Sequence, residues 1–491
     1  MNRYFIPSAG LVAAIMIANP LMAQTGPAQG ASGPNAVNLS LQEAVARATG
    51  ESEEVRLARA QYEIASAQIS EARAQALPQI NGTLGYTRTL ASSFDTGGGF
   101  SLPDSLRFDP DPTQPLEERV RYLEEKVPLA ALGSLSQLFS SLPFGQEHSY
   151  VAQVSGSQLL YAGGRVGAAL NIARDYRSAA GYNLTEETAD IMLQVKQAYY
   201  QALLARELEG ISVAALEQAE NFLAQEQLRL SAGQASELEV LRAEVARDNI
   251  RPQLVEARNA AELSELNLKR LVNIPLTERV NLTTPLSRPS ASELADAQLN
   301  PEALVAHRTS VLAAERQVSI RERQVRIARG AYLPTVSLSM NYGRQMYPLT
   351  TFDFSGNWRT DWTVGLTAQV PIFNGGQRGS ALSQARIELD RSRLQLSQLR
   401  EAVQMQYEQA RGEKVRASEA IAARERTVEQ AQRVYDLTVL RYDQGLATQL
   451  EVSQSRLDLL QARMNYAQAI TDFYIADAGV DRAATGINDA N

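Results

Sequence analysis

The chain of 491 residues contains no cysteine and few aromatic residues. Without cysteine, disulfide bonds, thiolate metal sites and lipidation of an N-terminal cysteine are all excluded. Aromatic residues make up only 6% of the chain, while alanine, glutamine, leucine, arginine and glutamate fill its long segments. This composition favours extended helices over a thick globular core. The net charge of -8 argues against nucleic acid as a partner.

Proline is absent from two long stretches, one between Pro143 and Pro252 and one after Pro371. An interior proline destabilises a helix by about 3 kcal/mol, so both stretches are candidates for long helices. From about Gly379 to Gln444, small and apolar residues recur at helical spacing. About 70 residues of helix would form a rod of roughly 105 Å, which needs a packed stripe along its length.

Long hydrophobic runs are also missing after the N-terminus. Residues 1–23 have the form of a secretory signal peptide, with Arg3, an apolar run over residues 5–18 and a small-residue cleavage site at residues 21–23. Beyond it, no stretch approaches the ~18 apolar residues of a transmembrane helix. We therefore expect an exported protein that is periplasmic, secreted, or built into the outer membrane as a β-barrel.

The chain does contain an internal repeat. Residues 72–86 recur at 328–342, at an offset of 256, and residues 159–170 recur at 371–382, at an offset of 212. The same interval of 70 residues separates two glycines in each copy, Gly163 from Gly233 and Gly375 from Gly445. A preserved interval indicates a fixed physical length, as a spanning structure needs. Gly233 and Gly445 then mark tight turns at which each long helix returns as an antiparallel hairpin.

Four segments alternate apolar and polar residues with the period of a β-strand: 79–91, 149–161, 335–347 and 358–370. In the last of them, Trp358, Trp362 and Leu366 share one face, whereas Thr363 and Thr367 lie on the other. Strands of about ten residues with one apolar face suit an outer-membrane barrel, although a soluble sandwich shows the same alternation. Four strands cannot close a barrel with a lumen, and open edges are not tolerated in lipid. In a membrane, several chains must therefore share one barrel.

Short motifs mark the junctions between the helices and the strands. Leu77-Pro78 and Leu333-Pro334 end a helix and start a strand, because the residue before proline is pushed towards extended geometry. The glycine pairs Gly163-Gly164 and Gly375-Gly376 mark the return from strand to helix. A glycine-rich turn before a helix can also bind phosphate, but neither pair has the Lys-Ser/Thr of a P-loop. We interpret all four motifs as structural junctions.

The chain resembles the TolC family of outer-membrane efflux and secretion ducts. The resemblance rests on the order of helix, Leu-Pro, strand, strand, Phe/Tyr-x-Gly-Gly, long helix, glycine turn and shorter helix, repeated once. It implies a mixed α and β membrane protein, a homotrimer that shares one 12-strand transmembrane β-barrel with four strands per chain. A long periplasmic α-helical (coiled-coil) barrel would continue this β-barrel. Because it has no cysteine, the chain resembles the unlipidated members of the family. The implied partners are outer-membrane lipid, a periplasmic adaptor (membrane fusion) protein and an inner-membrane transporter.

The repeat and the resemblance together predict the domain organisation after the signal peptide. We expect an N-terminal linker and first helical segment over 24–78, the first strand pair over 79–161 with an extracellular insert over 92–148, and the first periplasmic hairpin over 162–274. We then expect an inter-repeat linker over 275–300, a helical segment over 301–332, the second strand pair over 333–373, the second hairpin over 374–485 and a tail over 486–491.

By resemblance, the turns of the two hairpins form the periplasmic mouth and meet the adaptor. The residues at these turns are Gly233, Gln234, Ala235, Ser236, Gly445, Leu446, Ala447 and Thr448. Tyr442, Glu239 and Glu451 fall where the family has its constricting and acidic residues, so the resemblance implies a ring of six carboxylates in a trimer. A simpler interpretation stays open, because both glutamates lie in the first turn of a helix, where a carboxylate is a favourable cap.

Enzymatic chemistry has little support in the sequence. The two histidines, His148 and His307, lie in no zinc or triad spacing, and we expect no catalytic, metal or cofactor site. The sequence thus predicts a passive outer-membrane exit duct of a tripartite efflux or type I secretion system. The alternative is a periplasmic coiled-coil scaffold or envelope tether without a pore, in which the apolar strand face would lie in a protein core.

Overall fold

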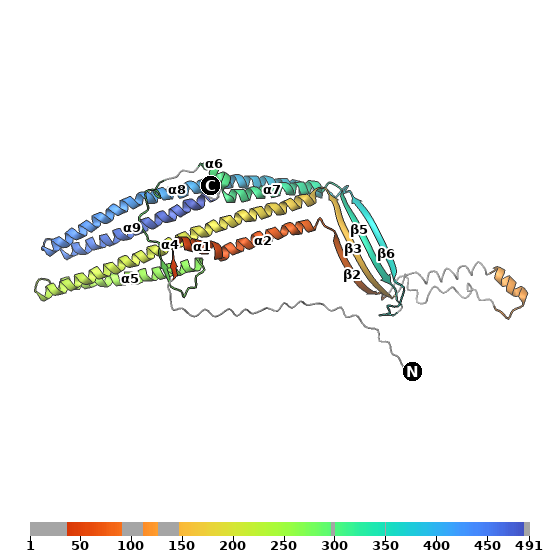
Figure 1. The fold of residues 1–491 in the computed structure, drawn as a ribbon, viewed down its shortest axis with the longest axis horizontal. Coiled ribbons are helices and arrows are strands. Elements are labelled where there is room, and N and C mark those ends of the chain that lie inside the picture. Colours follow the sequence, from red (N-terminus) through yellow and green to blue (C-terminus); the bar gives the residue numbers. More distant parts are fainter. Residues whose placement is uncertain (1–36, 91–110, 126–146, 296–299, 349, 486–491) are drawn as a thin grey trace, which may run out of the picture.

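The chain is elongated, with a β-sheet at one end and two helical hairpins at the other (Figure 1). The computed structural model describes residues 37–90, 111–125, 147–295, 300–348 and 350–485. The expected signal peptide over 1–23, the tail over 486–491 and most of the insert over 92–148 lie outside the described residues. Within the insert, residues 116–125 form a helix.

Two helices of 67 residues run along the molecule, α4 (Arg165–Ser231) and α8 (Gln377–Asp443). At 1.5 Å per residue, each is about 100 Å long. Each turns back into a helix of 35 residues, α5 (Glu237–Leu271) and α9 (Gln449–Ala483), so the chain forms two antiparallel hairpins. Pro252 lies inside α5, so the proline-free stretches mark the long helices but not the full extent of α5.

Both hairpins turn at a glycine in the left-handed region, Gly233 with φ 74° and Gly445 with φ 75°. In each turn, the residue after the glycine donates its N–H to a carbonyl five residues earlier over 2.8 Å, Gln234 to Arg229 and Leu446 to Arg441. These bonds close the last turn of α4 and of α8, and only glycine adopts the required backbone without strain. The two tips therefore have matching backbones.

Four strands form one antiparallel sheet in the order β2-β3-β5-β6. Each lies where the alternation of residues predicts a strand: β2 (Gln79–Arg88), β3 (His148–Ala162), β5 (Thr335–Met346) and β6 (Arg359–Gln369). The pair β2–β3 and the pair β5–β6 are joined through β3 and β5. The outer edges of the sheet are β2 and β6, which each pair on one side only.

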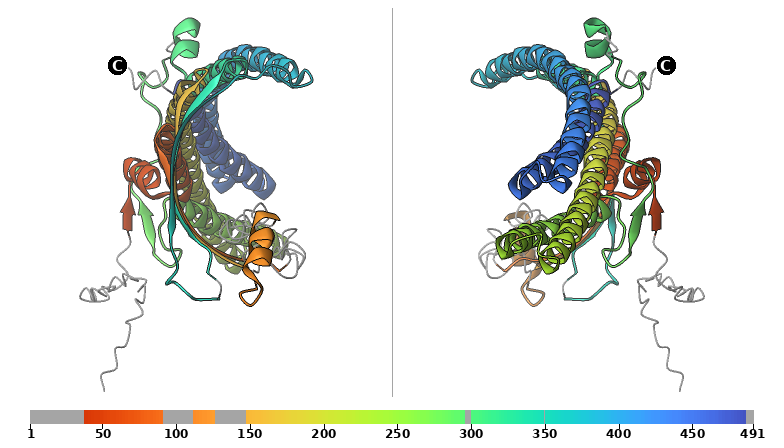
Figure 2. Two further views of the ribbon diagram at one scale, coloured as in Figure 1. Left: turned by 90° about the vertical axis from the view of Figure 1, so that its right-hand side faces the viewer. Right: turned by 90° about the vertical axis from the view of Figure 1, so that its left-hand side faces the viewer.

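Two further helices lead to the sheet, α2 (Glu53–Ala74) and α7 (Thr309–Gly330), both of 22 residues. α7 packs between α4 and α8, whereas α2 packs mainly against α4. Next to the four-stranded sheet, the helices therefore lie side by side in the order α2, α4, α7, α8. Nearer the tips, the order is α5, α4, α9, α8. Viewed along the long axis, the helices and the sheet follow a common arc that does not close on itself (Figure 2).

A second, small sheet lies near the middle of the molecule. β1 (Val37–Leu39) and β4 (Val280–Leu282) both have the sequence Val-Asn-Leu and pair in parallel. The side-chain amide of Asn281 donates to the Asn38 side chain over 3.1 Å. This sheet was not predicted from the sequence, and both segments were expected to be parts of linkers, because three residues are too few to display a strand period. The repeated tripeptide was the signal available.

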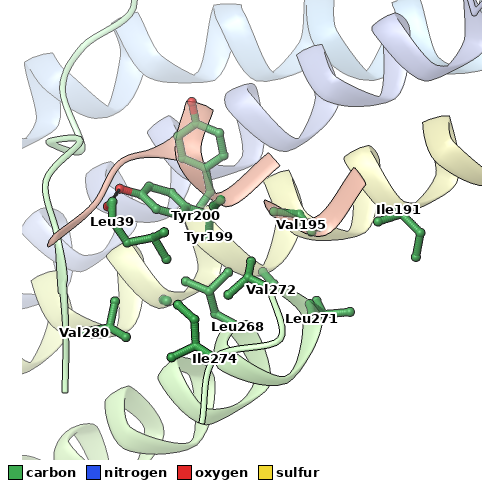
Figure 3. Packing of buried hydrophobic residues seen from close by; sticks show 14 of the residues in the cluster. Leu39, Ile191, Val195, Tyr199, Tyr200, Leu268, Leu271, Val272, Ile274 and Val280 are labelled. Carbon is green, nitrogen blue, oxygen red and sulfur yellow. Dashed lines mark hydrogen bonds between the residues drawn. The ribbon is translucent and has the colours of Figure 1, made fainter. Parts of the chain in front are cut away.

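The main hydrophobic core lies behind this small sheet (Figure 3). It joins the small sheet to α4, to the end of α5 and to the short helix α1 (Leu41–Glu51). Leu39, Val195 and Leu268 are each at most 1% exposed. Tyr199 is fully buried as well, and its hydroxyl donates to the carbonyl of Leu39 over 2.9 Å. The short helix α6 (Pro301–His307) packs in a smaller cluster against α8.

Candidate functional site

The four-stranded sheet carries one mostly apolar face, with Arg88 and Arg344 on it near one end of the strands. Directly paired residues project to the same face, and the register pairs Trp362 with Tyr342, Tyr342 with Val154 and Val154 with Gly82. The large side chains of this face are exposed: Leu84 87%, Trp362 71%, Ile80 70%, Leu366 67% and Val364 63%. A contiguous apolar surface of this kind is typical of a site that contacts lipid or another protein.

The opposite face of the sheet is polar and almost uncharged. On β2, β3 and β5 its residues are mostly Ser, Thr, Asn, Gln and Gly, as in Asn81, Thr83, Gln153, Ser155, Ser339 and Asn341. Only Arg359 and Asp361, near the start of β6, add charge. The helices continue the sheet end to end and do not lie over either face (Figure 1).

The two edges of the sheet are open. All ten residues of β2 are exposed, and so are all but one of the residues of β6. An edge strand presents a row of backbone N–H and C=O groups without partners in the sheet. These groups must be satisfied by water or by a strand of another chain.

The predicted junction motifs lie where the helices meet the sheet. Pro78 and Pro334 directly precede β2 and β5. Gly163 and Gly164 separate β3 from α4, while Gly375 and Gly376 separate β6 from α8, and all four glycines have positive φ. Gly163 also approaches Gly330 closely, because a Cβ atom added at Gly163 would lie 2.5 Å from the Gly330 carbonyl oxygen.

At the far end of the helices, Glu239 and Glu451 each close a capping box. The Glu239 carboxylate accepts from the backbone N–H of Ser236 over 2.6 Å, and the Glu451 carboxylate accepts from that of Thr448 over 2.6 Å. These backbone hydrogen bonds, with those from the two hydroxyls, lower the pKa of both carboxyl groups. Within one chain, the contacts agree with the capping interpretation, and the ionised carboxylates stay at the tips.

The eight predicted turn residues lie at the tips, where six are exposed and Ala235 and Ala447 are half-buried. Apolar side chains are exposed beside them: Leu450 70%, Leu228 69%, Leu446 64%, Leu238 55% and Leu440 54%. Both tips therefore present leucines next to a carboxylate that caps a helix.

Tyr442 lies between α8 and α4, and only 7% of it is exposed. Its hydroxyl donates to Oε1 of Glu226 over 2.9 Å, and the guanidinium carbon of Arg229 lies 4.8 Å from the ring centroid. Burial, and then the hydrogen bond to Glu226, raise the pKa of Tyr442. Glu226 is 1% exposed, and its second oxygen has no hydrogen-bond partner among the described residues.

Two polar contacts link the hairpins near the tips. One is the bond between Tyr442 and Glu226, and the other runs from the side-chain amide of Gln449 to the carbonyl of Glu239 over 2.7 Å. Glu226 was not predicted as a functional residue from the sequence. The available signal was a carboxylate in the same helical stripe as the buried Ala219 and Leu223.

Midway along the molecule, a buried ion-pair cluster fixes α7 and α9 to α4. The Glu186 carboxylate on α4 lies 2.6 Å from Arg482 and 3.4 Å from Arg308, and it accepts from the N–H of Ser310 over 2.8 Å. Arg482 also pairs with Asp190 over 2.5 Å. Arg308 is 5% exposed, so removal of Glu186 would leave a buried charge without its partner.

Among the described residues, no helix is both long enough and apolar enough to span a membrane. The same part of the chain contains no group of three or more His, Asp or Glu side chains placed to hold a metal ion.

A profile of the outer membrane efflux protein family matches residues 127–273 and 300–486. Outer membrane efflux protein BepC of Brucella suis is 23% identical over 294 residues, which are 60% of this chain and 63% of BepC. The pyoverdine export outer membrane protein OpmQ of Pseudomonas aeruginosa is 27% identical over 348 residues, which are 67% of this chain and 70% of OpmQ.

The fold is similar to that of a solved outer-membrane channel. The open state of the MtrE outer membrane channel of Neisseria gonorrhoeae matches with a TM-score of 0.69 over 93% of each chain, at 18% identity. The family profile covers more than half of the sequence, on both sides of the inter-repeat linker. The resemblance inferred from the sequence motifs and the outer-membrane localisation that it implies are both confirmed. The chain belongs to the outer membrane efflux protein family.

Proposed function

We propose that this protein is the outer-membrane exit duct of a tripartite efflux or type I secretion system. The observation that carries the proposal is the sheet, which has one exposed apolar face, one polar face and two unpaired edges. Within the hydrocarbon of a bilayer, each unsatisfied backbone group costs several kcal/mol. Pairing of both edges with other copies of the chain removes this cost.

The assembly we propose is a homotrimer with one barrel of twelve strands, four from each chain. The smallest membrane barrels have about eight strands, so four strands from one chain fall short and twelve leave room for a lumen. The apolar face would contact lipid and the polar face would line the pore. The common arc of the helices and the sheet supports closure around one axis, with the helices forming a periplasmic barrel below the membrane (Figure 2).

The mechanism we propose is passive. An inner-membrane transporter and a periplasmic adaptor would supply the energy and the contacts that open the duct. The adaptor would dock on the exposed leucines of the two tips. Opening then requires the hairpins to move apart, which breaks the bonds from Tyr442 to Glu226 and from Gln449 to Glu239.

The acidic ring also belongs to this proposal. Capping and charge are compatible roles, because the capping bonds lower the pKa of Glu239 and Glu451 and so maintain their charges. In a trimer, two carboxylates per chain would place six negative charges around the periplasmic mouth. Such a ring favours cations over anions. We keep the constricting role of Tyr442 as a prediction for the assembled mouth.

A scaffold without a pore fits the structure less well. It requires the apolar strand face to lie in a protein core, but Trp362, Leu366 and Val370 are 71%, 67% and 59% exposed. Among the described residues, no helix lies over the four-stranded sheet (Figure 1).

The experiment that tests the proposal uses the absence of native cysteine. A single cysteine at Ala447 is labelled with a photo-crosslinker in intact cells, and the captured proteins are identified by mass spectrometry. The matched control is a cysteine at the exposed Ala306 in α6, far from the tips. Capture of an adaptor and its transporter from Ala447 but not from Ala306 is expected. Capture of peptidoglycan-associated or scaffold proteins alone, together with no conductance in lipid bilayers, would contradict the duct.

A further inference from the structure

The two halves of the chain have equivalent elements at constant offsets. α2 and β2 correspond to α7 and β5 at an offset of 256, as the first helical residues Glu53 and Thr309 illustrate. β3 and α4 correspond to β6 and α8 at an offset of 212, as Arg165 and Gln377 illustrate. These offsets give the equivalent position in the other half for each residue of these elements, and so the backbone pairing that the equivalent elements should form.

Within the chain, the register of β5–β6 is the one that the offsets predict from β2–β3. The pair of Ile80 with Gly156 in β2–β3 becomes the pair of Val336 with Ala368 in β5–β6, and the structure has that pair. At the opposite end of the strands, the pair of Arg88 with His148 becomes that of Arg344 with Thr360, which is also present. The two offsets therefore predict the register of one strand pair from that of another, without a slip.

One strand pair has no equivalent within the chain. β3 pairs with β5, and the offsets turn this pair into β6 with β2, which are the two open edges of the sheet. We propose that β6 of one copy pairs antiparallel with β2 of a neighbouring copy in the register of β3–β5. The pairs of Gly156 with Met340 and of Ser157 with Ser339 then become Ala368 opposite Leu84 and Gln369 opposite Thr83. This inference rests on the proposed trimeric duct and specifies its subunit interface.

The helices support the same neighbour. α7 lies between α4 and α8, so the equivalent place of α2 is between its own α4 and the α8 of another copy. Ile320 of α7 is fully buried, whereas its equivalent on α2, Ile64, is 51% exposed. An apolar side chain that is exposed at an otherwise buried position indicates a missing partner surface.

The interface between copies differs chemically from the interface within the chain. Within the chain, the buried Asp175 on α4 pairs with Arg323 on α7 over 2.5 Å. The offsets turn this ion pair into Ile387 on α8 facing Ala67 on α2 of the neighbouring copy. Ile387 is 64% exposed in the single chain and Ala67 is exposed too. The contact between copies is thus apolar where the contact within the chain is an ion pair.

Disulfide formation tests the register. A variant with Ala368→Cys and Leu84→Cys and another with Gln369→Cys and Thr83→Cys are oxidised in isolated outer membranes. Neighbouring pairs alternate between wide and narrow spacing along an antiparallel ladder, so one of the two variants has the narrow spacing that favours a disulfide. The controls shift the register by two residues, pairing Ala368→Cys with Tyr86→Cys or with Gly82→Cys. Each single-cysteine variant is oxidised in the same way as a further control.

We expect the matched variant to shift from the monomer to a reducible trimer on denaturing gels, while the shifted and single variants stay monomeric. The uncrosslinked assembly is measured separately by mass photometry in detergent. A trimer that crosslinks only in a shifted register, or in none, overturns the proposed interface and leaves the duct standing. The absence of any trimer overturns both.

Charged residues introduced into the contact between α8 and α2 provide an independent test. Ile387→Asp places a carboxylate in the apolar contact, so the trimer should dissociate at a lower temperature. Ala67→Arg together with Ile387→Asp recreates the ion pair of Asp175 with Arg323 and should restore the dissociation temperature. Equal temperatures for the single and the double variant would contradict the proposed contact.

Discussion

Gly163 and Gly375 occupy equivalent places in the two halves of the chain and differ in their surroundings. Their φ angles are 63° and 65°, and each joins a strand to a helix of 67 residues. A Cβ atom at Gly163 would lie 2.5 Å from the carbonyl oxygen of Gly330, whereas no atom lies within 4 Å of one at Gly375. The same motif thus produces the same backbone, while the packing depends on whether the neighbouring helix belongs to the same chain.

The halves also differ near the tips. Tyr442 and Glu226 link α8 to α4, but the equivalent positions in the opposite halves are Leu230 and Thr438. The hydrogen bond therefore exists once per chain, although the helices that carry it are equal in length. A repeated architecture need not repeat its polar contacts.

Substitution of the two junction glycines should give the largest difference. Gly375→Ala places alanine in the left-handed region, which costs about 1–2 kcal/mol. Gly163→Ala adds a clash with backbone, so we expect it to destabilise the fold by more than about 3 kcal/mol. Thermal unfolding of single chains in detergent measures both, because a neighbouring copy would cover Gly375 in the proposed trimer. Similar unfolding temperatures for the two variants would show that the close approach of Gly163 to Gly330 is not rigid.

The link near the tips should have the next largest effect. Tyr442→Phe removes the hydroxyl that donates to the buried Glu226, which should cost about 1–3 kcal/mol and raise the bilayer conductance as the hairpins separate. In the Tyr442→Phe background, the buried Glu226 carboxylate keeps its contact with Arg229 at 3.5 Å but loses its hydrogen bond, so Glu226→Leu should recover part of the stability. Leu230→Ala is a matched control at the equivalent position of the first half. Unchanged conductance in Tyr442→Phe would argue against a role for this link in closing the mouth.

The capping residues of the two tips should respond alike. Ser236→Ala and Thr448→Ala each remove a side-chain cap and should destabilise the hairpin by about 1 kcal/mol. Hydrogen exchange of the first turns of α5 and α9 measures the effect locally. A large difference between the two variants would show that the tips, despite matching backbones, have different neighbours in the assembly.

The smallest effect concerns pH. The capping hydrogen bonds lower the pKa of Glu239 and Glu451 below the ordinary value of 4.5. The stability from these caps is therefore fully present above pH 4.5 and is lost as the pH falls through the lowered pKa values. The cation preference of the duct should likewise persist at pH 4.5. Reversal potentials in a salt gradient measure it, with the double variant Glu239→Gln and Glu451→Gln as control. A preference that the double variant retains would exclude the acidic ring.

Much of the fold follows from patterns that are local in the sequence. The alternation around Trp362 predicts β6, and the glycine at each tip predicts a hairpin turn. The contacts that these local patterns do not predict join residues far apart in the chain. Tyr442 meets Glu226 across 216 positions, and β1 meets β4 across 243. Neither helical spacing nor strand alternation carries information about such partners.

The sequence by itself determined the lengths of the helices, the places of the turns and the apolar face of each strand, because backbone propensity and residue period act locally. The tertiary structure decided which copies of these elements are buried. Ile320 is covered by the packing of α7 between α4 and α8, while the equivalent Ile64 is exposed at the edge of the arc. The physical reason is that one chain forms three strand pairs and leaves the outer edges of β2 and β6 without a partner strand in the sheet.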